Sequence, residues 1–152
     1  MNVRNRVLPL IAVAGVFVLV ATSVVRLGAQ QDTPADFTNA ALAEVRNAQG
    51  QVVLSGKFAV SEDEEDENET ERKAPLAPTS IDPDAAGEAE VEVSGTGNSR
   101  RQEVEFSVHN LAANTAYTFV IDGRVFTTAT TDGRGRIALE RNVPLPGASQ
   151  TR

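Results

Sequence analysis

The sequence predicts an all-β protein, an antiparallel sandwich of about seven short strands in one domain. Apolar and polar residues alternate with a period of two in several segments, which is typical of strands with one buried face. Turn sequences such as Asp-Gly separate these segments at close spacing. No segment after residue 40 shows the 3.6-residue periodicity of an amphipathic helix. A chain of 152 residues is long enough for one such domain.

The first 30 residues are expected to lie outside this domain. Arg4 and Arg6 precede an uncharged apolar run over residues 7–25, which is the pattern of an export signal. We favour cleavage after Ala29, although the run approaches the ~20 residues that span a bilayer. The alternative is an uncleaved anchor helix. Both alternatives place the rest of the chain outside the cytoplasm, secreted or periplasmic.

The composition excludes several classes of function. The net charge of −7 gives no basic face for nucleic acid. The absence of cysteine excludes disulfides and thiolate metal sites. We therefore expect an unknown protein or envelope partner, no nucleic acid, and membrane contact only through residues 7–25 if they are not cleaved.

The alternating segments assign an inward face to each predicted strand. A first strand is expected in LAEVRN, followed by a strand with Val52, Leu54, Phe58 and Val60 on one face. Two later segments, EAEVEVS and VEFSVHN, direct six residues inward: Ala89, Val91, Val93, Val104, Phe106 and Val108.

Asp122-Gly123 predicts a tight hairpin, because both central positions of its two-residue turn need a positive φ. This turn would pair Ile121 with Arg124, Val120 with Val125, and Phe119 with Phe126. A second turn over residues 131–136 leads into a further strand. The three successive strands are expected to share one apolar face, formed by Tyr117, Phe119, Ile121, Phe126, Ile137 and Leu139.

Residues 61–87 differ from the alternating segments, since they contain a block of acids followed by prolines. Like charges repel one another and resist burial, so we expect a long solvated acidic insertion. The domain would then cover residues 38–146, after a flexible leader at 31–37 and before a tail at 147–152. Carboxylates suit calcium, so the candidate metal ligands are Glu62, Asp63, Glu64, Glu65, Asp66, Glu67, Glu69 and Glu71.

The segment LAANTAY resembles the element that leads into the F strand of fibronectin type III domains. Leu111, Thr115 and Tyr117 have the spacing of that family, whereas Ala113 replaces its usual proline and the family's buried Trp is absent. The resemblance implies an immunoglobulin-like sandwich with a tyrosine corner. In such a corner the Tyr117 ring would lie in the core and its hydroxyl would bond to upstream backbone.

The segments ERKAPL and GEAEVEV are similar to those of bacterial CHRD-type envelope domains. Those domains commonly have a pair of histidines near their end, and this chain has none there. The resemblance therefore implies an envelope role without supporting a metal role.

No residue pattern predicts an enzyme. Ser107 and His109 share the outward face of one strand, but no glycine-rich nucleophile elbow accompanies them. The outward glutamates of two strands, Glu88, Glu90, Glu92, Glu103 and Glu105, would form an acidic wall that needs offset pairing, counter-ions or a basic partner. We expect a non-enzymatic module with a structural or partner-binding role; the alternative is a divalent-cation (calcium) binding protein.

Overall fold

The computed structural model describes residues 35–61 and 69–146. This part of the chain forms nine strands, all paired antiparallel, and a short 3₁₀ turn at Gly97–Ser99. The all-β prediction is confirmed, with nine strands in place of about seven. The strands are β1 Leu42–Arg46, β2 Val52–Lys57, β3 Ala59–Val60, β4 Glu69–Pro78, β5 Ala86–Ser94, β6 Arg101–His109, β7 Ala116–Ile121, β8 Arg124–Thr130 and β9 Ile137–Asn142.

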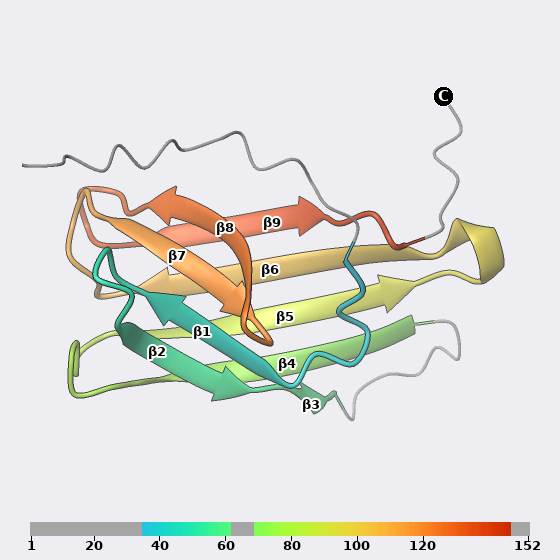
Figure 1. Ribbon diagram of the computed structural model, residues 1–152, viewed down its shortest axis with the longest axis horizontal. Helices are drawn as coiled ribbons and strands as arrows, with labels where there is room; N and C mark the ends of the chain where they lie inside the picture. Colours follow the sequence, from blue (N-terminus) through green and yellow to red (C-terminus); the bar gives the residue numbers. More distant parts are fainter. Residues whose placement is uncertain (1–34, 62–68, 147–152) are drawn as a thin grey trace, which may run out of the picture.

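The strands form one nearly closed, barrel-like sheet in the order β8-β7-β1-β2-β4-β5-β6-β9, with β3 paired to β4. Figure 1 shows its two halves crossing at an angle, β8-β7-β1-β2 over β4-β5-β6-β9. The halves join where β2 pairs briefly with β4, through Leu54 opposite Pro78 and Ser55 opposite Ala77. The opposite side, between β8 and β9, is where the sheet ends.

The core lies between the two halves. The six predicted inward residues of β5 and β6 are all buried, as expected. Phe106 of β6 meets Phe119 of β7 edge-on across the core, with 4.9 Å between ring centroids. The predicted inward face of β2 is wrong in part, because a register shift beside Val45 buries both Val53 and Leu54. Val60, which was expected on the same face, lies in β3 and is exposed.

The β7–β8 hairpin forms at the predicted turn. Asp122 and Gly123 have φ values of 48° and 76°, and Ile121 and Val120 have their predicted partners. The third predicted pair is wrong, since Phe119 lies opposite Thr127 after a register shift. The extra residue in β8 changes the direction of the Phe126 side chain. Its ring stacks on that of Phe106, with 6.0 Å between the ring centroids.

The last strand does not continue this hairpin. The six apolar residues expected on the shared face of three successive strands do belong to the core or pack against it. The expected order of the strands is wrong, because β9 pairs with β6 and not with β8. Ile137 therefore enters the core from the layer opposite Phe119. The connection crosses between layers at Gly135, whose φ is 72° and whose position leaves no room for a Cβ against the Leu111 carbonyl.

The prediction of a solvated insertion over residues 61–87 is wrong for Glu69–Pro78, which form β4. This strand lies within the sheet, between β5 on one side and β2 and β3 on the other. Alternation explains its position, since Ala74 and Leu76 point into the core while Glu71 and Lys73 point outward. Residues 62–68 lie outside the described residues.

Residues 31–37 were predicted to form a flexible leader. This prediction is wrong for the last residue of the range, because Phe37 is buried. The amide of Phe37 donates to Gln102 Oε1 at 2.7 Å, and Gln102 Nε2 donates to the Ala35 carbonyl at 3.0 Å. The predicted signal or anchor at residues 1–30 lies outside the described part of the chain. Within residues 35–61 and 69–146, we find no helix with the length and apolar character needed to cross a membrane.

Candidate functional site

One face of the molecule is strongly acidic. Successive side chains of a strand point to opposite sides of the sheet, so the apolar residues of β4, β5, β6 and β9 enter the core and their polar neighbours point outward. We call this outward side the acidic face. It carries eight glutamates and two cations: Glu69, Glu71, Glu88, Glu90, Glu92, Glu103, Glu105, Glu140, Lys73 and Arg101.

The register places the glutamates directly opposite one another. Glu105 of β6 lies between Glu90 of β5 and Glu140 of β9. In the next row, Glu92 lies between Glu71 and Glu103. Offset pairing was one of the predicted ways to reduce the repulsion within the acidic wall. That alternative is wrong, because the glutamates of neighbouring strands lie directly opposite one another. Like charges directly opposite destabilise a sheet, so the other two alternatives, counter-ions and a basic partner, remain.

Lys73 is the cation inside this face. Its Nζ lies 2.6 Å from Glu71 Oε1 and 3.9 Å from Glu90 Oε2. The Lys73 ammonium lowers the pKa of Glu71 through this close contact, and Glu71 in turn raises the pKa of Lys73. Lys73 thus neutralises mainly Glu71.

Glu90 has the most perturbed carboxyl of this face. Desolvation and the neighbouring carboxyls of Glu71 and Glu105 raise the pKa of Glu90 from 4.5 to about 7. Desolvation also raises the pKa of Glu103, as do the charges of Glu140, Glu105 and Glu92. Both shifts have the same physical cause, because partial burial and like charges both disfavour the ionised form.

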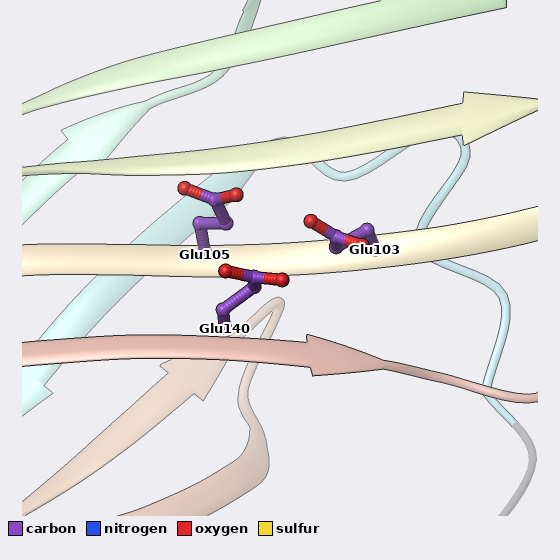
Figure 2. A group of neighbouring side chains, drawn as sticks. All are labelled: Glu103, Glu105 and Glu140. Atoms are coloured by element: carbon purple, nitrogen blue, oxygen red, sulfur yellow. The ribbon is translucent and has the colours of Figure 1, made fainter.

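Glu103, Glu105 and Glu140 form a carboxylate triad on β6 and β9 (Figure 2). Each offers one oxygen, and the three oxygens lie within 4.8 Å of one another. Calcium takes six to eight oxygen ligands, so the triad supplies part of a coordination sphere that water would complete.

The candidate metal residues predicted from sequence do not converge on this triad. Residues 62–67, which contain six of the eight, lie outside the described residues. Glu69 is exposed at the beginning of β4, and Glu71 is paired with Lys73. The sequence did place Glu103 and Glu105 in the acidic wall. It missed Glu140, because β9 was expected beside β8 and its alternation alone did not identify β6 as its neighbour.

A separate surface hollow brings Ser107, His109 and Asp132 together, beside Arg136. Asp132 Oδ1 accepts hydrogen bonds from the amides of Arg134 and Arg136, at 2.8 and 2.9 Å. These bonds, together with the charges of both arginines, lower the pKa of Asp132. The carboxylate of Asp132 therefore orders its own turn.

Tyr117 has the structural role that the sequence predicts. The side chain is 4% exposed, and its hydroxyl accepts a hydrogen bond from the Ala112 amide at 3.2 Å. The predicted contact of the hydroxyl with upstream backbone is thereby confirmed, and His109 is exposed as expected.

Comparisons with models of protein families, with curated proteins and with solved structures gave no match. The resemblances to fibronectin type III and CHRD-type domains therefore stay predictions.

Proposed function

We propose that this protein is an exported, non-enzymatic β-module that binds a positively charged partner through its acidic face. The single observation that carries the proposal is the direct opposition of glutamates across β4, β5, β6 and β9. This arrangement opposes the folding of the sheet, because like charges directly opposite one another repel. A cationic partner would relieve it.

The partner is a protein or envelope component with a basic surface. A face with one sign of charge raises the rate of encounter with an oppositely charged partner and rejects partners of like charge. Lys73 and Arg101 are too few to neutralise eight carboxyl groups. The acidic face therefore supports charge-directed docking better than it supports a purely structural role.

Two finer assignments belong to the same proposal. The apolar run at residues 7–25 supports export from the cytoplasm, with the module in the envelope or outside the cell. The buried Tyr117 and its bond to Ala112 support an immunoglobulin-like sandwich as the finer description of the fold.

Binding of a fluorescently labelled decalysine peptide to the full-length chain in a non-ionic detergent tests this function. We expect saturable binding that weakens as salt is added, because ions screen exposed charges. Decaglutamate should not bind. The double variant Glu103→Gln/Glu105→Gln should weaken decalysine binding by roughly twofold to tenfold, since each exposed ion pair contributes at most about 1 kcal/mol.

The matched control is Asp82→Asn/Asp84→Asn, which removes the same charge from the turn between β4 and β5. This control should bind decalysine almost as tightly as the unaltered protein. Equal losses in both double variants would show attraction to net charge alone and would overturn the assignment of the acidic face.

A second candidate function is divalent-cation binding, which the convergence of Glu103, Glu105 and Glu140 favours. Calorimetric titration with calcium would show saturable heat, and Glu140→Gln would remove it. A melting temperature unchanged by calcium would reject this candidate, because a ligand that binds only the folded state must stabilise it.

A further inference from the structure

The surface hollow formed by β6, β9 and the turn before β9 lies at one end of the acidic face. Its volume is about 560 Å³. Ser107 and Ala138 lie opposite each other in it, and their short side chains leave the surface low between the two strands. His109 ends β6 and Arg136 comes just before β9, so both border the hollow on the side away from the glutamates.

The turn before β9 holds the backbone of Arg136 in place. The Asp132 amide donates to the Arg136 carbonyl at 2.9 Å, and the Arg136 amide donates to Asp132 Oδ1 at the same distance. The Gly135 carbonyl accepts a hydrogen bond from the Leu111 amide at 3.1 Å. The side chain of Arg136 takes no part in these bonds. It is exposed and makes no ion pair among the residues that the structure describes, so its donors are available to a ligand.

The charges around the hollow determine which kind of ligand it can bind. Arg134 and Arg136 are positive, whereas Asp132 is negative and Glu88 lies opposite Ser107 on β5. These four charges cancel, and further glutamates follow along the same strands, so a free anion gains little here. An anionic group attached to a cationic ligand gains more. The cation binds the glutamates and thereby raises the local concentration of the anion at the hollow.

We propose that the hollow binds a carboxylate of the same partner whose cationic groups dock on the acidic face. The inference rests on the proposed function and adds the charge pattern of the partner to it. A planar guanidinium can donate to both oxygens of a carboxylate, and Ser107 and His109 offer further donors beside Arg136.

The spacing of the two contacts follows from the strand. A strand rises about 3.3 Å per residue, and Glu105 precedes His109 by four residues. The carboxylate would therefore lie roughly 13 Å from a cation bound beside Glu105. The partner is thus a basic segment that is followed directly by a carboxylate.

Two forms of decalysine that differ in a single group test this inference. One form ends in a free carboxylate and the other in an amide, and both carry the same fluorophore at the amino end. Attraction to the acidic face alone favours the amide form, because it has the higher net positive charge. The proposed contact predicts the reverse order. The carboxylate form should bind the full-length chain in a non-ionic detergent about twofold to fivefold more tightly, the contribution of one exposed ion pair.

Arg136→Gln should remove this preference. The substitution leaves the turn intact, because the bonds to Asp132 are made by the backbone of residue 136. The matched control is Arg124→Gln, which removes the same charge from the beginning of β8 and should keep the preference. The inference is overturned if the carboxylate form does not bind more tightly than the amide form, or if Arg136→Gln keeps the preference. Absence of binding by both forms would instead overturn the proposed function, and this inference with it.

His109 gives a second readout, because it is the only histidine of the chain and decalysine contains none. At constant pH, its imidazole proton signals in the NMR spectrum should shift more with the carboxylate form than with the amide form. A preference for the carboxylate form with equal His109 shifts would place the contact elsewhere and overturn the assignment of the hollow.

Discussion

The ring of Phe37, in the segment before β1, packs edge-on against the ring of Phe126 in β8, with 6.2 Å between their centroids. Phe126 also stacks on Phe106 of β6, and the Phe37 amide bonds to Gln102 of the same strand. The N-terminal segment therefore connects the two layers on the side where the sheet ends.

Replacement of Phe37 by alanine should destabilise the protein strongly. Loss of a buried phenylalanine removes apolar burial and leaves a cavity, so we expect a decrease of about 3 kcal/mol in the free energy of unfolding. Urea denaturation measures this decrease. Phe37→Leu is the control and should lose much less, since it keeps most of the buried volume. An unchanged denaturation midpoint for Phe37→Ala would show that the segment does not contribute to the core.

Replacement of Tyr117 by phenylalanine should have a small, specific effect. The ring stays in the core, but the Ala112 amide loses its acceptor, so the free energy of unfolding should fall by about 0.5–1.5 kcal/mol. Thermal denaturation followed by circular dichroism measures it. Tyr117→Ala, which also creates a cavity, should cost several times more. Equal melting temperatures for Tyr117→Phe and the unaltered protein would exclude a stabilising role for the hydroxyl.

Asp122 should stabilise the fold through two features. Its Oδ1 accepts hydrogen bonds from the amides of Ala41 and Leu42, at 3.0 and 2.9 Å, and its backbone has a φ of 48°. Asp122→Ala removes the acceptor of both hydrogen bonds and strains the turn, which should cost about 1–3 kcal/mol. Asp122→Asn keeps an oxygen acceptor and tolerates positive φ, so its loss should be smaller. If both variants unfold at the same urea concentration, the side-chain oxygen contributes nothing.

The stability of the protein should fall as the pH rises through about 7. The pKa of Glu90 is about 7 in the folded protein and near 4.5 when the chain is unfolded, so the folded state binds the additional proton between these values. Its stabilising contribution is complete below the lower value and is lost as the pH rises past the upper one. The pKa of Glu71 is lowered, so its contribution changes only in more acidic solution.

Melting temperatures measured between about pH 5.5 and about pH 8 test this dependence. Glu90→Gln should melt higher than the unaltered protein at the alkaline end and show a flatter profile. A profile with the same slope in both proteins would assign the effect to other groups.

The sequence by itself determined most of the strands and most of their inward faces. Alternation over Ala89–Val93 and Val104–Val108 is a local property, because the pleat sends successive side chains to opposite sides. The Asp122-Gly123 turn was equally predictable, since a two-residue connection fixes the pairs beside it. Tyr117 followed from the spacing of a short local element.

Only the tertiary structure decided which strands are neighbours. Alternation assigns a face to β9 but not a partner, and pairing with β6 joins residues far apart in the chain. For the same reason, the sequence did not predict that part of an acidic segment forms β4, or that Glu140 lies opposite Glu105. The acidic face is therefore a consequence of register between distant strands, because a glutamate meets a like charge only when the complete sheet has formed.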